Sequence, residues 1–192
     1  VPTCHYMMGG APTNIHGQVF QQTNGTEAPI QGLFSVGEAA CVSVHGANRL
    51  GGNSLLDLVV FGRAAGKHIN EDLKSGGGVA YANDDDIDKS LERLNCLNAS
   101  SKGYEVGEVK RELQDVMQKY FGVFRRGEFM EKGTKMLVDI REKTNNLYLK
   151  DKSESFNTNR VEALALQNLL EVAEATAISA LERTESRGAH AR

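Results

Sequence analysis

The apolar run Leu-Leu-Asp-Leu-Val-Val-Phe at residues 55–61 constrains the fold of this chain more than any other stretch. Gly51 and Gly52 precede it, and Asn53 and Ser54 are residue types preferred at the N-cap of a helix. The sequence therefore predicts a loop that leads into a helix from about residue 54 to residue 75. Because the first half of this helix is apolar on every side, we expect it to be buried inside a body larger than a two-layer minidomain.

The loop before this helix combines an imidazole, a guanidinium, amide side chains and two adjacent glycines within residues 45–54. The first free N–H groups of a helix favour an anion or an electron-rich oxygen, so a ligand is expected at the helix start. The alternative that the loop by itself allows is a glycine-rich surface turn with a solvated Arg49.

Three motifs carry a resemblance to one protein family. Gly-Glu-Ala-Ala at residues 37–40 leads into His-Gly-Ala-Asn-Arg-Leu-Gly-Gly-Asn-Ser-Leu at 45–55, His-Tyr-Met-Met-Gly-Gly lies upstream at 5–10, and Glu-Ser-Arg-Gly-Ala-His lies at 185–190. Together they resemble the flavoproteins of the succinate dehydrogenase and fumarate reductase family. The resemblance spans nearly the whole chain and implies a piece of such a flavoprotein that begins in mid-protein.

The resemblance implies a substrate site for a dicarboxylate. Arg49 matches the motif arginine that grips a carboxylate, for which a bidentate guanidinium supplies both charge and orientation. His5 matches a histidine that hydrogen-bonds a substrate carboxylate, whereas its surroundings alone indicate only a satisfied or exposed imidazole. No catalytic residue and no metal ligand is expected in this chain, because the family's proton-transferring arginine belongs to parts that it does not contain.

The resemblance also implies FAD as the cofactor. Glu38, Asn53, Ser54 and Leu55 match cofactor-binding positions, with backbone N–H groups of Ser54 and Leu55 offered to the flavin pyrimidine oxygen. The alternative for Glu38 is a solvent-facing carboxylate. The chain contains no Gly-x-Gly-x-x-Gly phosphate loop, so the piece by itself is expected to lose FAD and to be inactive.

The activity implied is oxidation of succinate to fumarate by hydride transfer to FAD, with electrons passed to an iron-sulfur subunit and quinone. Membrane anchor subunits are further implied partners, at the cytoplasmic face of a bacterial inner membrane or on the mitochondrial matrix side. A fumarate reductase flavoprotein and a non-catalytic helical interaction module are the alternatives. The motif at residues 185–190 is expected to be a structural tie between the helical part and the flavin domain.

The sequence predicts an α+β fold in two domains, residues 1–78 and 79–192, separated at the glycines of residues 76–78. The first is the C-terminal portion of an FAD-binding domain, with a hairpin or two short strands near residues 15–22 and 32–37 around Asn24-Gly25. The second is an antiparallel helical bundle. Its helices are predicted from the acidic residues 84–86 to a break at residues 100–103, at about 106–125, at about 128–147, and at about 158–182.

Apolar spacing predicts the core face of each later helix, and Asn159 with Glu162 has capping-box spacing at the start of the last one. For the last helix the predicted core positions are Val161, Leu164, Leu169, Val172, Thr176 and Leu181.

Composition excludes several classes of protein. The net charge of -3, with both signs interspersed, gives no reason to expect a nucleic-acid partner, and no apolar stretch is long enough to span a membrane. Cys4, Cys41 and Cys96 are odd in number and lack a Cys-x-x-Cys pair, which argues against a disulfide framework and a structural zinc site. We expect a reducing compartment.

Overall fold

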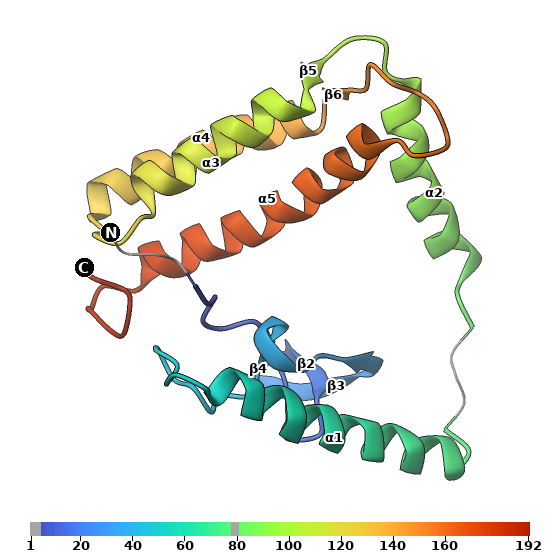
Figure 1. The fold of residues 1–192 in the computed structure, drawn as a ribbon, viewed down its shortest axis with the longest axis vertical. Helices are drawn as coiled ribbons and strands as arrows, with labels where there is room; N and C mark the ends of the chain where they lie inside the picture. The colour runs from blue at the N-terminus through green and yellow to red at the C-terminus, as the bar shows by residue number, and fades with distance from the viewer. Residues whose placement is uncertain (1–4, 78–80) are drawn as a thin grey trace. The chain divides into compact units, whose positions relative to one another are not determined.

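The computed structural model describes residues 5–77 and 81–192, whose elements are shown in Figure 1. The chain divides into one compact unit that ends at Tyr81 and a second that begins at Ala82. Both mix helices with short strands, as expected for the α+β class. The predicted boundary after Gly78 lies outside the described residues, as does Cys4.

The first unit contains two small sheets. Strand β1 (Ala11–Pro12) pairs in parallel with β4 (Ala40–Cys41), and β2 (Gln18–Thr23) pairs antiparallel with β3 (Thr26–Phe34). Asn24 and Gly25 join β2 to β3 with φ angles of 54° and 78°, the left-handed conformation that a tight hairpin turn requires. The predicted hairpin is confirmed, but β3 begins before Pro29 and not after it.

Helix α1 (Asn53–Lys74) follows the 3₁₀ turn η1 (Gly37–Ala39) and β4. Gly37 has a φ of 77°, and a β-carbon there would overlap the side chain of Leu58, so only glycine allows η1 to approach α1 this closely. Among the residues of α1, only Asp57 and Ala65 are buried. The expected burial of its first half is wrong for this chain, because two-stranded sheets are too narrow to cover a helix that is apolar all round.

The second unit is mostly helical. Its elements are α2 (Asp84–Ala99), β5 (Tyr104–Glu105), α3 (Val106–Tyr120), α4 (Gly127–Thr144), β6 (Leu147–Tyr148) and α5 (Thr158–Glu182). Helix α4 packs against both α3 and α5, and β5 pairs in parallel with β6 (Figure 1). One apolar core joins these elements, and its largest fully buried side chains include Leu113, Met130, Leu137, Ile140, Leu149, Leu166 and Leu170.

The start of α5 differs from the predicted capping box. Its N-cap is Asn157, whose side-chain oxygen accepts a hydrogen bond from Arg160 N–H at 2.8 Å. The amide of Asn157 also donates to the carbonyl oxygens of Asp151 and Ser153. Asn157 prevails over Asn159 because these donated bonds tie the preceding loop to the helix start while the oxygen caps it.

The core face of α5 is only partly the predicted one, since the predicted positions Leu164 and Leu181 pack against the core. Val161 and Val172 are 64% and 52% exposed, while the buried positions are Ala163, Leu166, Leu170, Ala173, Ala177 and Ala180. Small alanine side chains let α5 lie close to its neighbours, so this face buries backbone as well as side chains. Apolar spacing misled the prediction because α5 is apolar on more than one side.

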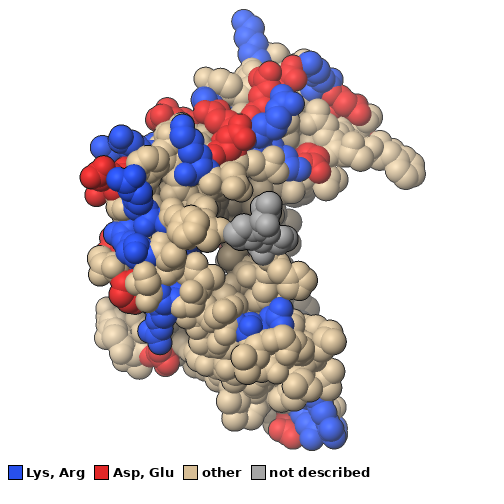
Figure 2. All heavy atoms as spheres, turned by 60° about the vertical axis from the view of Figure 1, so that its left-hand side comes forward, with Lys and Arg blue, Asp and Glu red and all other residues tan. Residues whose placement is uncertain are grey.

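The surface carries both signs of charge, and Figure 2 shows basic and acidic side chains interspersed on the face it displays. Several form ion pairs between helices, such as Lys143 with Glu112 and Arg141 with Glu171. Within the described part of the chain, we find no helix that combines the length and hydropathy required to cross a bilayer.

Candidate functional site

The loop from β4 to α1 and the first turn of α1 together contain most of the residues expected to bind ligands, namely Arg49, Asn53, Ser54 and Leu55. The last residue of the loop, Gly52, is the N-cap of α1 and has a left-handed φ of 82°. Asn53 and Ser54, expected as capping residues, are instead the first residues of the helix, and no side chain caps its start. Gly52 takes the cap because the chain turns there through a left-handed conformation that asparagine and serine adopt at a cost. No side chain of the loop occupies the N–H groups of this first turn, but those of Asn53 and Leu55 donate to the backbone carbonyl oxygens of Leu50 and Gly52, each at 3.2 Å.

A histidine and an aspartate close this loop onto the helix. His45 Nε2 lies 2.9 Å from Asp57 Oδ2, across 12 positions of the chain. The side chain of Asp57 is only 4% exposed and that of His45 only 13%. A buried carboxylate is costly unless it is paired, so this contact stabilises both the helix start and the loop before it.

Arg49 lies in the loop that the contact of His45 with Asp57 closes, and its guanidinium stacks on an aromatic ring. Its guanidinium carbon is 4.3 Å from the ring centroid of Tyr6, within the range of a cation–π contact. The ring of Tyr6 also meets His45 edge-on, with centroids 6.0 Å apart and planes at 80°. Tyr6, from the N-terminal segment, is thus held between the histidine and the arginine of the loop.

Two nitrogens of this cluster are buried without a hydrogen-bond partner among the described residues, His45 Nδ1 and Arg49 Nε. Arg49 Nη1 donates to the carbonyl oxygen of its neighbour Leu50 at 3.1 Å, a local bond. Buried polar atoms are normally satisfied, so the unpaired Nε of Arg49, which is a donor, is consistent with a bound oxygen-rich ligand.

The N-terminal segment also meets η1. Met7 N–H donates to Glu38 Oε1 at 2.8 Å, which holds this carboxylate beside residues 5–10. His5 itself is exposed, and it precedes the residue that stacks under Arg49. The structure thus brings His5, Glu38, Arg49 and the start of α1 into one region of the first unit, although no contact joins His5 directly to Arg49.

Sequence reasoning assigned no role to Tyr6, His45 or Asp57. The signal for Asp57 was available, since it is the single charge in an apolar run. Tyr6 and His45 lie inside the quoted motifs, but their contacts join segments far apart in sequence. What the cluster can do chemically follows from its groups: the guanidinium of Arg49, with its unused Nε donor, can hold a carboxylate.

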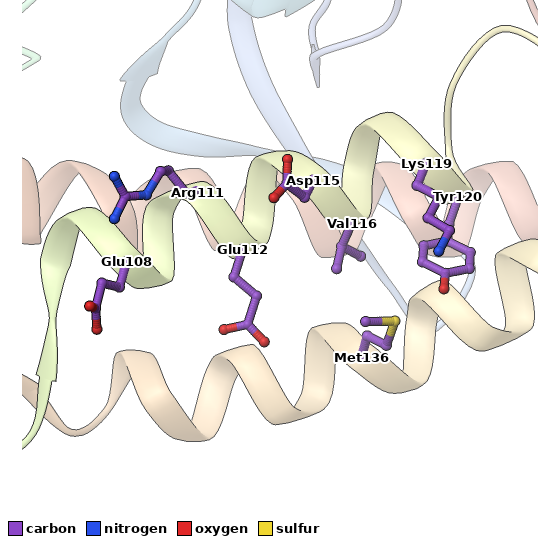
Figure 3. Close-up of a pocket in the computed structure, with 8 residues that line it drawn as sticks. All are labelled: Glu108, Arg111, Glu112, Asp115, Val116, Lys119, Tyr120 and Met136. Carbon is purple, nitrogen blue, oxygen red and sulfur yellow. The ribbon is translucent and has the colours of Figure 1, made fainter.

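A pocket lies in the second unit, between α3 and α4 (Figure 3). Its volume is about 400 Å³ and its lining mixes Glu108, Arg111, Glu112, Asp115, Val116, Lys119, Tyr120 and Met136. Lys143 donates to both oxygens of Glu112 at 2.7 Å. None of the residues expected to bind substrate or cofactor lines this pocket. We interpret it as a surface groove between two helices that ion pairs join.

Comparison with known proteins matches both ends of the chain. The FAD binding domain family model matches residues 1–55, and the model for the fumarate reductase flavoprotein C-term matches residues 110–192. The succinate dehydrogenase flavoprotein subunit of Coxiella burnetii is 51% identical over all of this chain and 33% of its own length.

Two solved structures share the fold. A variant of the E. coli quinol fumarate reductase chain FrdA matches 98% of this chain and 31% of its own, with a TM-score of 0.87 and 36% identity. The Mycobacterium smegmatis Sdh1 complex has a chain that matches 100% of this one and 31% of its own, at TM-score 0.87 and 30% identity. The chain thus spans about a third of the length of the curated relatives it matches.

The matched models and relatives are those of one class of protein, flavoproteins with an FAD binding domain, and the relatives are named succinate dehydrogenase and fumarate reductase subunits. Within that class, the chain belongs to the succinate dehydrogenase and fumarate reductase flavoprotein family.

Proposed function

We propose that this chain supplies part of the substrate and FAD sites of a flavoprotein subunit that oxidises succinate to fumarate. The observation that carries the proposal is Arg49, which stacks on Tyr6 and keeps a buried, unpaired Nε among the described residues. A guanidinium held on one face is suited to bind a planar carboxylate with its remaining donors. His5 donates the second contact to the substrate from the segment that also contains Tyr6.

The residues at the start of α1 fit FAD. No side chain caps the helix, so the N–H group of Ser54 suits an electron-rich flavin oxygen, with Asn53 beside it. The Leu55 N–H donates to the carbonyl oxygen of Gly52 at 3.2 Å and exchanges this bond for the flavin in the proposal. Leu55 is apolar yet 70% exposed, which suits coverage by an aromatic ring system. Glu38, fixed by Met7 N–H, binds a cofactor hydroxyl in this proposal. FAD, when bound, accepts the hydride that leaves the substrate.

The direction of the reaction is part of the proposal. The relative named succinate dehydrogenase from Coxiella burnetii is 51% identical, whereas the fumarate reductase flavoprotein subunit of Proteus vulgaris is 39% identical. These figures favour succinate oxidation. Electrons then pass to an iron-sulfur subunit and quinone, and membrane anchor subunits place the complex at the cytoplasmic face of a bacterial inner membrane or on the mitochondrial matrix side.

The proposed domains are residues 1–78 for FAD and substrate, and 79–192 as a helical bundle domain. The shared core of α3, α4 and α5 supports the second. Leu55 and Val59, in the apolar first half of α1, are 70% and 69% exposed. Because large apolar side chains exposed together indicate a surface that another part covers, they support a first domain that continues into further parts of a longer protein.

Arg49→Lys in the full-length flavoprotein tests the proposal. Lysine keeps one positive charge but loses the planar fork, so the substrate is held by one mobile donor and misaligned. We expect succinate-dependent dye reduction to fall by at least ~10²-fold, the scale of small misplacements of reacting groups, while the ratio of flavin to protein absorbance stays unchanged. The control is Arg63→Lys, an exposed position on α1, which is expected to remain fully active. An active Arg49→Lys enzyme would contradict the proposal, and a flavin-free one would move Arg49 to the cofactor.

A further inference from the structure

We propose that Asp57 and His45 are positioning residues that act through Tyr6 to hold the Arg49 guanidinium in place. The inference rests on the proposed function, since it concerns how Arg49 meets a substrate carboxylate. It assigns a purpose to a buried histidine–aspartate contact and an aromatic contact that substrate and cofactor binding leave unexplained.

Asp57 interrupts an apolar run at the start of α1. It lies one turn into α1 among Leu55, Leu56 and Leu58, where a leucine would suit both the apolar run and the helix. Its carboxylate is nevertheless 4% exposed and meets His45 Nε2 at 2.9 Å. Replacing both partners of a buried hydrogen-bonded pair by apolar groups can be nearly neutral or stabilising, so stability alone does not explain an aspartate here.

The pairing defines the orientation of His45. A carboxylate only accepts, so Nε2 of His45 carries the hydrogen and the imidazole plane is fixed with respect to α1. The imidazole then meets the ring of Tyr6 with an angle of 80° between the ring planes and 6.0 Å between the centroids, a favourable edge-to-face arrangement. Tyr6 belongs to the N-terminal segment, so His45 fixes that segment relative to the loop.

Tyr6 completes the chain of contacts to Arg49. The guanidinium lies 4.3 Å above its ring, while the bond from Arg49 Nη1 to Leu50 oxygen is to an adjacent residue and moves with the loop. The contact that fixes the arginine relative to α1 therefore runs through Tyr6, His45 and Asp57. A displacement of about 1 Å in a substrate-holding group can cost ~10² in rate, which makes this support consequential.

The test is a double-mutant cycle in the full-length holoenzyme, with Asp57→Leu, Arg49→Lys and both together. We expect Asp57→Leu to retain FAD and to lower kcat for succinate by about tenfold, because the guanidinium is less well aligned. In the Arg49→Lys background the same change is expected to have almost no further effect, because the group that Asp57 positions is already gone. Asp57→Asn, which keeps an acceptor oxygen for His45, is expected to restore most of the loss.

A matched control exists on the same helix. His68 Nε2 lies 3.4 Å from Asp72 Oδ2, a more exposed pair of the same chemistry, so Asp72→Leu is expected to leave kcat unchanged. Substitutions of Tyr6 test the same chain of contacts without changing α1. Tyr6→Phe keeps the aromatic ring and is expected to retain activity, whereas Tyr6→Leu is expected to lower kcat as much as Asp57→Leu does.

The outcomes separate the two proposals. If Arg49→Lys is as active as wild type, the proposed substrate role fails. If Arg49→Lys is impaired but Asp57→Leu is fully active, or its effect is undiminished in the Arg49→Lys background, the positioning inference fails. Loss of FAD from Asp57→Leu, or equal activity of Tyr6→Leu and Tyr6→Phe, would likewise overturn it.

Discussion

Arg125 Nη1 donates a hydrogen bond to Nδ1 of His190 at 2.9 Å, across 65 positions of the chain. Because arginine has no acceptor, Nδ1 is the acceptor, and Nε2 carries the hydrogen that is donated to the carbonyl oxygen of Arg183 at 3.1 Å. His190 is 8% exposed. The motif at residues 185–190 thus fastens the chain after α5 to the turn after α3, through contacts that lie inside the second unit.

We expect His190→Leu to destabilise the second unit by about 1–3 kcal/mol, because two hydrogen bonds are lost and their buried partners are left in apolar surroundings. Urea unfolding followed by the helical circular-dichroism signal measures the change. Lys89→Ala is the control, since Lys89 pairs with Asp86 at an exposed site and should contribute less than about 0.5 kcal/mol. Equal unfolding midpoints for His190→Leu and wild type would show that the motif has no structural role here.

Gly133 marks the closest approach of α4 to the end of α3. A β-carbon there would lie 2.6 Å from Cβ of Tyr120 and from Cε2 of Phe121. We expect Gly133→Ala to destabilise the unit by about 1–2 kcal/mol, because the overpacking cost exceeds the gain of ~1 kcal/mol in helix propensity. Gly107→Ala in α3 meets open space and should instead stabilise. Thermal unfolding of both variants tests the prediction, which is wrong if the two shift Tm in the same direction.

The pair of Lys143 and Glu112 makes stability depend on alkaline pH. The ammonium of Lys143 donates to both carboxylate oxygens of Glu112, which raises the pKa of Lys143 above its usual 10.5. A pKa that is higher in the folded state than in the unfolded state contributes stability that is complete below pH 10.5 and is lost as pH rises through the folded-state pKa. We expect the difference in unfolding free energy between wild type and Lys143→Met to be constant near neutral pH and to shrink at strongly alkaline pH.

Glu112→Gln provides the matched variant for this pair. It is expected to abolish the alkaline dependence in the same way, and the double variant should lose no more than either single one. Additive losses, or a difference that grows with alkaline pH, would mean that the pair does not carry the effect.

The 192-residue chain by itself is expected to be colourless and inactive with succinate. It contains residues suited to the flavin ring but no glycine-rich loop to bind the pyrophosphate, so FAD should dissociate. Flavin absorbance after gel filtration in the presence of FAD measures retention. Stoichiometric yellow protein would show that the start of α1 and Glu38 bind FAD sufficiently well without such a loop.

Local sequence determined much of the secondary structure. The Asn24-Gly25 turn, the helix before residue 75 and the last helix, Thr158–Glu182, were all predictable, because turn residues and apolar periodicity act over a few neighbouring positions. The motif residues His5, Glu38 and Arg49 also stand out in sequence, and their binding roles remain predictions.

Tertiary structure decided what these elements do to one another. Alanines form the buried face of α5 because neighbouring helices approach closely there, which no single-helix pattern reveals. Asn157 became the cap because it also binds the preceding loop. Most of all, the contacts that join Tyr6 to His45 and Arg49 bring together segments about forty positions apart, and only packing of the folded chain can bring such distant side chains within reach.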